Sequence, residues 1–232
     1  MVTYQEAEER WKGKLGDEYT DRNDFWKSPN RVKFWYSLQK KYDFIRPLEI
    51  GCNTCNNLYA MCRIAMIPRF YGIEINDHAL RLAHEIHPYF EIIHGSIIDI
   101  PFKDNFFDLV FTCGVLIHIP PDGLDKALEE MYRVSNKYIL IMEYYAEEER
   151  ERPFRGEMGI TWERPYDKIV MKKYPNLKLL ERGFLTIEDG FNNIFYWMFE
   201  KDILQKDLEE ALRDIEEGNL ISQEEIEREI EK

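Results

Sequence analysis

One stretch of the sequence decides the fold: residues 46–58, RPLEIGCNTCNNL. It starts with the apolar end of a strand, turns at Gly51 through small and polar residues, and passes into a helical pattern from Leu58. A glycine lets the backbone turn and approach a ligand, and the free N–H groups of a helix N-terminus face that ligand. The stretch therefore predicts a nucleotide-binding element, with one glycine where dinucleotide loops have three.

A second apolar run, residues 70–74, ends in an acid 23 residues after Gly51. An acid about 20 residues beyond such a turn suits the two hydroxyls of a ribose. We therefore expect Glu74 to bind a ribose.

Strand and helix patterns alternate from residue 47 onward. Strands are predicted at 47–51, 69–74, 90–94, 107–112 and 137–144, and helices at 55–66, 76–87 and 122–135. The strands are nearly continuous apolar runs, which are typical of strands that helices bury on both faces. The sequence therefore predicts an α/β fold with a doubly wound, mostly parallel sheet.

The segments before and after this core do not show the same alternation of strands and helices. Helices are predicted at 4–15 and 30–42, the charged run 146–153 is predicted to be a solvated loop, and a helix is expected at 165–174. Two later runs, 177–187 and 193–200, predict an antiparallel pair at the end of the sheet. We expect an N-terminal helical cap (1–45), a ligand-binding domain (46–200) and acidic C-terminal helices (201–232).

The composition narrows the possible partners. The chain has 232 residues and a formal charge of −13, which argues against a nucleic-acid partner. Within 201–232 there are 12 acidic and 5 basic residues, so 12 − 5 = 7 of those negative charges lie in the tail. No apolar run reaches the roughly 18 residues of a membrane span. We expect a cytoplasmic protein without membrane contact, whose tail packs on its own domain or forms a homodimer.

The cysteines do not predict a metal site. Cys52 and Cys55 have the spacing of zinc knuckles and redox pairs, but Cys62 and Cys113 do not repeat it. We expect reduced thiols that fill a crowded turn, and no bound metal.

Residues 47–200 resemble the class I S-adenosylmethionine-dependent methyltransferases. The resemblance rests on the Glu49–Gly51 turn, the acid Glu74, Gly95-Ser96 and the string FDLV at 107–110. More narrowly, residues 10–200 resemble the methylases associated with pseudaminic acid biosynthesis. The strings that carry this resemblance are GDEYTDRN (16–23), FKDNFFDLVFT (102–112), GVLIHI (114–119), YILI (138–141), EYY (143–145) and RG (155–156), with Asn53 and Asn57.

One position departs from that family, because Cys55 stands where its members usually repeat a glycine. The predicted helix 55–66 already includes this position, and a helical residue tolerates a side chain. A positive φ at Cys55 would instead weaken the site.

The resemblance implies a seven-stranded sheet with an antiparallel last strand, and S-adenosyl-L-methionine as cofactor. It implies cofactor contacts from the cap, from the turn after the first strand, and from the ends of the next three strands. These residues are Tyr19, Arg22, Glu49, Gly51, Asn53, Asn57, Glu74, Ile75, Ser96, Ile97, Thr112, Cys113 and Gly114.

The acceptor side is predicted from four residues: His118, Glu143, Tyr145 and Arg155. A histidine can accept a hydroxyl proton near neutral pH, and an arginine can clamp an acidic group. The resemblance implies a small polar acceptor, namely a sugar or sugar-acid oxygen in glycan synthesis. Two alternatives stay open, a nicotinamide-dependent oxidoreductase and a non-catalytic assembly module that uses the C-terminal helices.

Overall fold

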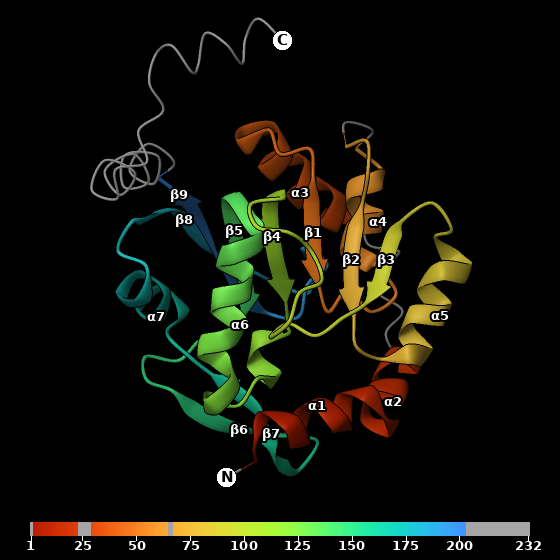
Figure 1. The fold of residues 1–232 in the computed structure, drawn as a ribbon, viewed down its shortest axis with the longest axis vertical. Coiled ribbons are helices and arrows are strands. Elements are labelled where there is room, and N and C mark those ends of the chain that lie inside the picture. The colour runs from red at the N-terminus through yellow and green to blue at the C-terminus, as the bar shows by residue number, and fades with distance from the viewer. Residues whose placement is uncertain (1, 23–28, 65–66, 203–232) are drawn as a thin grey trace, which may run out of the picture. The chain divides into compact units, whose positions relative to one another are not determined.

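The computed structural model describes residues 2–22, 29–64 and 67–202, and the statements below concern these residues. Its core is a seven-stranded sheet with the order β3-β2-β1-β4-β5-β9-β8 (Figure 1). The strands are β1 (Pro47–Ile50), β2 (Tyr71–Glu74), β3 (Glu91–His94), β4 (Phe107–Cys113), β5 (Ser135–Glu143), β8 (Leu177–Leu185) and β9 (Ile194–Lys201).

The strands of the sheet run in the predicted directions. The first five strands pair in parallel, and β9 runs antiparallel to both β5 and β8. The α/β class and the mostly parallel, doubly wound sheet are therefore confirmed. The chain order reverses between β1 and β4, and ligands of such sheets bind beyond the carboxyl ends of the strands at that point.

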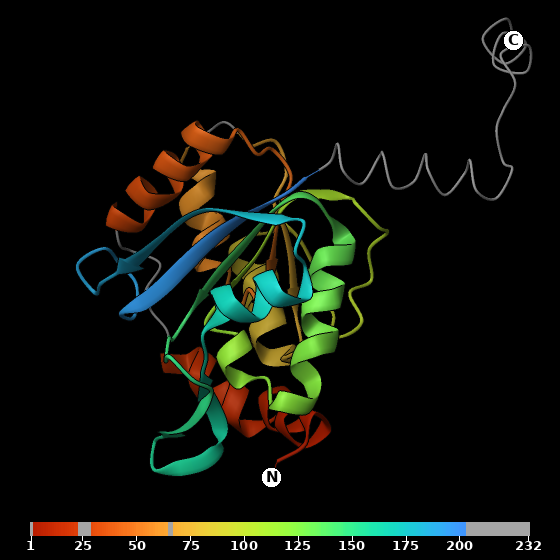
Figure 2. The same cartoon turned by 90° about the vertical axis from the view of Figure 1, so that its left-hand side faces the viewer.

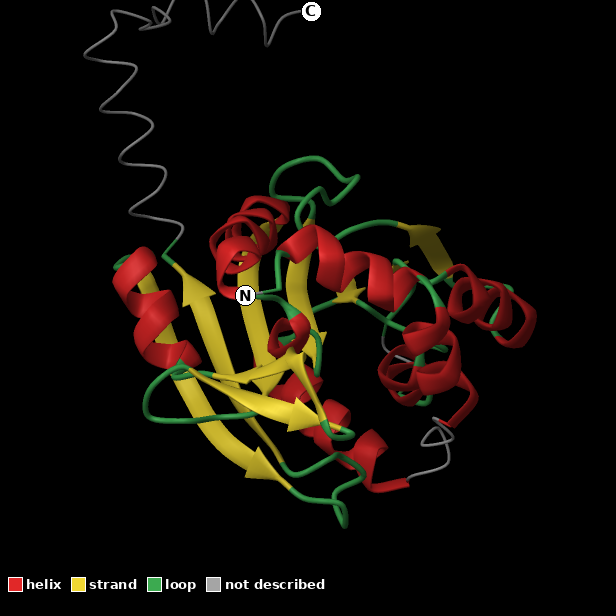
Figure 3. Cartoon of the chain, turned by 90° about the horizontal axis from the view of Figure 1, so that it is seen from below, coloured by secondary structure: helices red, strands yellow, loops and turns green. Residues whose placement is uncertain are grey.

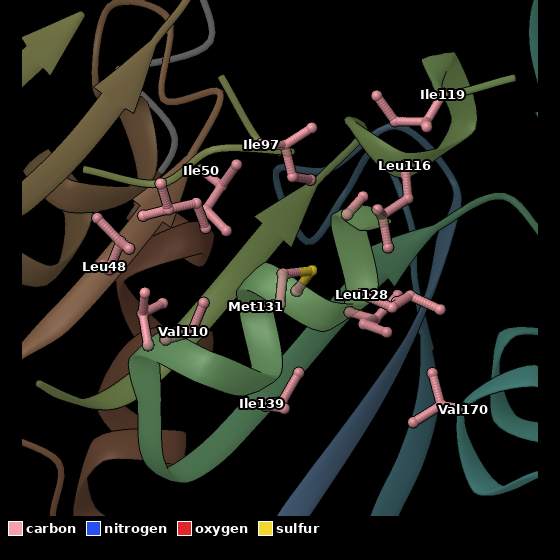
Figure 4. Packing of buried hydrophobic residues seen from close by; sticks show 14 of the residues in the cluster. Leu48, Ile50, Ile97, Val110, Leu116, Ile119, Leu128, Met131, Ile139 and Val170 are labelled. Carbon is pink, nitrogen blue, oxygen red and sulfur yellow. The ribbon is translucent and has the colours of Figure 1, made fainter. Parts of the chain in front are cut away.

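Helices cover both faces of the sheet (Figure 2). One face packs against α3 (Pro29–Tyr42), α4 (Asn56–Cys62) and α5 (Asp77–Ile86), and the other against α6 (Pro121–Val134) and α7 (Tyr166–Lys173). Leu128 and Met131 of α6 lie over Val110 and Ile139 of the sheet (Figure 4). Burying one such side chain stabilises the fold by roughly 1.5–3 kcal/mol, so these layers hold the strand ends rigidly.

Two N-terminal helices, α1 (Tyr4–Lys12) and α2 (Lys14–Arg22), lie below the carboxyl ends of the strands in Figure 1. The single helix predicted at 4–15 is wrong, because Gly13 ends α1 and a second helix follows. The cap is fixed to α6, since Asp122 accepts the Tyr4 N–H at 3.1 Å. A Cβ at Gly123 would lie 2.4 Å from the Tyr4 ring, so this contact requires a glycine.

A second sheet, formed by β6 (Arg150–Phe154) and β7 (Glu157–Glu163), corrects the prediction of a solvated loop at 146–153. The two strands cross in front of the main sheet when the molecule is viewed from the strand ends (Figure 3). Arg150 and Arg152 pair with the buried Glu163, so the charges of this run form an ion-pair network on a hairpin.

No helix within the described ranges is long and apolar enough to cross a membrane. The predicted tail helices fall almost wholly on residues 203–232, which lie outside the described residues.

Candidate functional site

A cavity of about 280 Å³ lies at the carboxyl ends of the parallel strands. Its wall comes from the residues that follow β1, β2, β3 and β4, and from α1 and α2 on the opposite side. Its volume is near the lower end of the roughly 300–1,000 Å³ of small-molecule sites. Because these four strands are neighbours, the cavity suits an elongated ligand that crosses several strand ends.

The turn after β1 has an unusual backbone. Gly51, Asn53 and Cys55 have φ values of +63°, +47° and +64°, and α4 begins only at Asn56. Cys55 is therefore not helical, which contradicts the predicted helix start. A left-handed conformation costs an ordinary L-residue roughly 1–2 kcal/mol, while asparagine adopts it more readily. The turn thus has a left-handed residue at every second position, and only one of the three is a glycine.

The side chain of Cys55 points away from the cavity. Cys55 is fully buried, and its Sγ lies 3.9 Å from the backbone oxygen of Asn53. Because the side chain lies in the protein interior, the strain at Cys55 is carried by the backbone and the cavity wall stays clear. Burial raises the pKa of the Cys55 thiol.

The described residues contain no cluster of His, Cys, Asp and Glu arranged to hold a metal ion.

Asn53 ties the turn to its surroundings. Its N–H donates to Glu74 Oε2 at 2.7 Å, and its Nδ2 donates to Thr20 Oγ1 of α2 at 2.8 Å. Its Oδ1 accepts the Thr54 N–H at 2.9 Å. Asn53 lines the cavity, but its side-chain amide already holds α2 against the turn.

Glu74 lies at the end of β2 and lines the cavity, as expected of a ribose ligand. Its Oε1 accepts the N–H groups of Ile75 and Asn76, both at 2.9 Å. Burial raises the pKa of Glu74, although the backbone N–H groups oppose the shift. A carboxylate oxygen can accept two hydrogen bonds, so Oε2 retains capacity for a ligand hydroxyl beside the Asn53 N–H.

Glu49 ends in the cavity with one oxygen unpaired. Asn57 donates to its Oε1 at 2.7 Å, and Trp35 Nε1 donates to Asn57 Oδ1 at 3.3 Å. No residue of the described chain hydrogen-bonds the buried Oε2. Burial raises the pKa of Glu49 to about 8. An unpaired buried acceptor is costly, so this oxygen is suited to a cationic hydrogen-bond donor.

Arg31 of α3 reaches the same end of the cavity. It is buried, its Nε and Nη2 donate to the Gly190 oxygen at 3.1 and 2.6 Å, and its guanidinium lies 4.8 Å from the Phe191 ring centroid. Its charge lowers the pKa of Glu49, against the larger effect of burial. A cation and an unpaired acid side by side fit an α-carboxylate and an α-ammonium.

His118 ends a short 3₁₀ helix, Leu116–His118, that follows β4. Its Nδ1 lies 2.8 Å from the Ile160 oxygen, and its ring lies 4.3 Å from Trp11 and 5.6 Å from Phe154. Burial lowers the pKa of His118 to about 4, so the ring is neutral at pH 7. A carbonyl only accepts, so the proton is assigned to Nδ1 and Nε2 carries a lone pair.

Glu143 is not part of the cavity wall. Its carboxylate accepts the N–H groups of Val115, Leu116 and Ile117 at 3.0, 3.0 and 3.2 Å. Burial raises the pKa of Glu143 to about 7. Glu143 therefore holds the segment that presents His118, and its carboxylate does not reach an acceptor.

The structure brings most of the predicted site residues to the cavity. Those in its wall are Tyr19, Glu49, Gly51, Asn53, Asn57, Glu74, Ile75, Ile97, Cys113, Gly114 and His118. Those that it places elsewhere are Arg22, Ser96, Thr112, Glu143, Tyr145 and Arg155.

The displaced residues have identifiable positions. Arg22 and Arg155 are exposed, the latter in the β6–β7 turn. Thr112 is fully buried, and Ser96 donates to Glu8. Tyr145 packs on Phe195, at 5.2 Å between ring centroids. In the strand-end pair it is Tyr144 that lines the cavity.

Several other residues of the cavity wall were not predicted from the sequence. They are Tyr4, Glu8, Trp11, Arg31 and Phe154. The first three share one helix face, so their spacing carried a usable signal. The others reach the cavity only through the packing of α3 and the β6–β7 hairpin, which no local pattern shows.

Comparison with known proteins agrees with this geometry. Residues 48–138 match the family model described as "Methyltransferase domain". A demethylmenaquinone methyltransferase of Lysinibacillus sphaericus is 29% identical over 108 residues, which cover 43% of this chain and 45% of that protein. A probable methyltransferase ltbC of Aspergillus luteorubrus is 26% identical over 171 residues, covering 68% of this chain and 59% of that protein. The chain thus spans about half the length of such curated relatives.

A similar fold occurs in the 1,6-didemethyltoxoflavin-N1-methyltransferase of Burkholderia thailandensis, crystallised with S-adenosylhomocysteine. The TM-score is 0.67 at 10% identity, covering 87% of this chain and 91% of that one. The matches confirm the class I fold, and they support a methyltransferase domain with S-adenosylmethionine as cofactor. These matches favour a methyltransferase over a nicotinamide-dependent oxidoreductase.

Proposed function

We propose that this chain transfers a methyl group from S-adenosylmethionine to an oxygen of a small polar acceptor. The observation that carries the proposal is the order of groups along the cavity. Arg31 and the unpaired Glu49 oxygen lie at the β1–β4 end, Glu74 follows at β2, and Ile97 lies beyond β3. This order fits an amino acid, a ribose and a base joined in one molecule.

The cofactor supplies an activated methyl group when it is bound. The protein must hold the acceptor oxygen in line with that methyl group, exclude water and remove a proton. Arg31 and Glu49 bind the two charges of the amino-acid end, and Glu74 accepts the ribose hydroxyls. Tyr19 closes the cavity from α2.

His118 is the proposed proton acceptor. Its Nδ1–H is held by the Ile160 oxygen, and it lies in the cavity wall with Nε2 as its acceptor atom. Its low pKa makes it a weak base, but a hydroxyl becomes strongly acidic as its oxygen gains a methyl group. A neutral imidazole is therefore sufficient, and it does not have to lose a proton first.

The acceptor class that we propose is a sugar or sugar acid. Support comes from the resemblance to methylases of pseudaminic acid biosynthesis and from the aromatic faces of Trp11, Tyr144 and Phe154 in the cavity wall. Aromatic rings offer flat apolar surfaces on which the C–H face of a sugar ring can pack.

A second candidate acceptor is an aromatic hydroxyl. The same aromatic wall suits a planar ring, and relatives 25–29% identical are named demethylmenaquinone methyltransferases. These relatives match only about half their length, so their substrate does not carry over without a test.

The two acceptor classes are distinguished by methyl transfer from radiolabelled cofactor. One panel contains nucleotide sugars and sugar acids, and a second contains phenols and reduced quinones. Label in the first panel that is lost with His118→Asn supports a sugar acceptor, and label confined to the second replaces it. Label in neither panel, while S-adenosylhomocysteine binds, contradicts both acceptor classes.

We further propose that residues 201–232 act as a separate segment that joins two copies of the chain. Support comes from their composition and from the compact unit that ends at Lys201. Deletion of 203–232 should convert a dimer to a monomer in light scattering and leave cofactor binding intact. A monomeric full-length chain contradicts this proposal.

A further inference from the structure

The cavity ends beneath α1, beyond the carboxyl end of β3. Ile75 and Ile97 supply apolar surface there, and Tyr4 and Glu8 of α1 complete the wall. Residues four apart lie on the same face of a helix, so both side chains point from α1 to this end. A carboxylate therefore lies in the same wall as the apolar side chains of Ile75 and Ile97.

Glu8 is held firmly in this position. Tyr4 Oη and Ser96 Oγ both donate to its Oε1 at 2.7 Å, and Lys12 Nζ donates to its Oε2 at 2.8 Å. Its side chain is 16% exposed. Burial opposes its charge, yet hydrogen bonds from Lys12, Ser96 and Tyr4 keep the pKa of Glu8 below its usual value. The group is an ionised carboxylate with a fixed orientation.

The order of the strands places this carboxylate relative to the ligand. The amino-acid end lies at β1 and β4, and the ribose carboxylate Glu74 lies at β2. β3 is the next strand in the same direction, so the group attached to the ribose lies over its end. On the proposed function, that group is the adenine ring.

We propose that Glu8 binds the exocyclic amino group of adenine and so selects the base of the cofactor. The amino group is a donor, and Glu8 Oε2 has remaining acceptor capacity beside Lys12. The ligand residue comes from the cap and not from the sheet. Ser96, which follows β3, supports Glu8 with its hydroxyl.

The proposal predicts discrimination between two bases. S-inosylhomocysteine differs from S-adenosylhomocysteine by an oxo group in place of the amino group and by a proton on the adjacent ring nitrogen, N1. Facing a carboxylate, the oxo group loses a hydrogen bond and meets a like partial charge. A hydrogen bond to a charged group contributes about 1.5–3 kcal/mol, which corresponds to a preference of roughly 10- to 100-fold.

The experiment is a calorimetric titration of both compounds into the wild-type chain, Glu8→Gln and Glu9→Gln. Glu9 is the matched control, because it also pairs with Lys12 but lies outside the cavity wall. The wild type and Glu9→Gln should prefer the adenine compound. Glu8→Gln should lose the preference, because an amide can accept from an amino group or donate to an oxo group.

Equal binding of both compounds by the wild type overturns the proposal, as does a Glu8→Gln variant that keeps the wild-type preference. If Glu8→Gln does not fold, Glu8→Ala replaces it, and an undiminished preference in Glu8→Ala overturns the proposal. A wild-type chain that binds neither compound contradicts the cofactor assignment itself. Failure of the Glu8 proposal is therefore distinct from failure of the proposed function.

Discussion

Replacing Glu49 with glutamine should stabilise the free protein at neutral and alkaline pH while weakening cofactor binding. Burial raises the pKa of Glu49 from 4.5 to about 8. The native state therefore holds this proton more tightly than the unfolded chain. The stability that the protonated acid contributes is complete below pH 4.5 and is lost as the pH rises toward 8.

The magnitude follows from these two values. Each pKa unit corresponds to about 1.36 kcal/mol, so the loss is about 1 kcal/mol at pH 5, about 3 kcal/mol at pH 7 and about 4 kcal/mol at pH 8. Glutamine does not ionise and avoids this loss. Its buried amide adds a cost of about 1–3 kcal/mol at every pH. The change in the free energy of unfolding between pH 5 and pH 8 is therefore the diagnostic quantity.

The assay is chemical unfolding of the wild type, Glu49→Gln and the exposed control Glu85→Gln at both pH values. Relative to wild type, Glu49→Gln should gain about 3 kcal/mol between pH 5 and pH 8, and the control should gain nothing. Its affinity for S-adenosylhomocysteine should fall roughly 10- to 100-fold, because the α-ammonium loses a charged acceptor. A stability difference that does not change with pH refutes the reasoning.

Substitutions at three further positions, Cys55, His118 and Glu143, test separate features of the turn, the proposed base and its support. Cys55→Gly should be more stable than Cys55→Ala by about 0.5–1 kcal/mol in urea unfolding, because glycine relieves the left-handed strain, and the reverse order contradicts this. His118→Asn retains a donor for the Ile160 oxygen but lacks the base, so kcat should fall about 10²- to 10⁴-fold, and a fall below tenfold removes the proposed base. Glu143→Gln places an amide against backbone N–H groups and should cost about 1–3 kcal/mol of unfolding free energy, whereas unchanged stability contradicts its anchoring role.

The sheet was predictable from sequence because its strands are apolar runs separated by strong turn and helix signals. The positions of Gly51 and Glu74 were also predictable, because Gly51 must turn the chain after one strand and Glu74 must end the next. Cys55 was misplaced because its left-handed backbone is imposed by the turn, against its own preference.

Other predictions were wrong because charged residues occur both in solvated loops and in buried ion pairs. The run 146–153 has the composition of a loop, but long-range pairing with Glu163 makes part of it a strand. Arg22 and Arg31 are both arginines near the start of the chain, and sequence alone did not show which is buried. Only the packing of α3 on the end of the sheet places Arg31 in the cavity.

The most direct test is a calorimetric titration with S-adenosylhomocysteine at pH 7 in two buffers of different ionisation enthalpy. With a pKa of about 8, Glu49 is mostly protonated in the free protein at this pH. Binding of an α-ammonium against it should therefore release close to one proton, with one ligand bound per chain. Absence of binding, or binding without proton release, contradicts the assignment of this cavity to the cofactor.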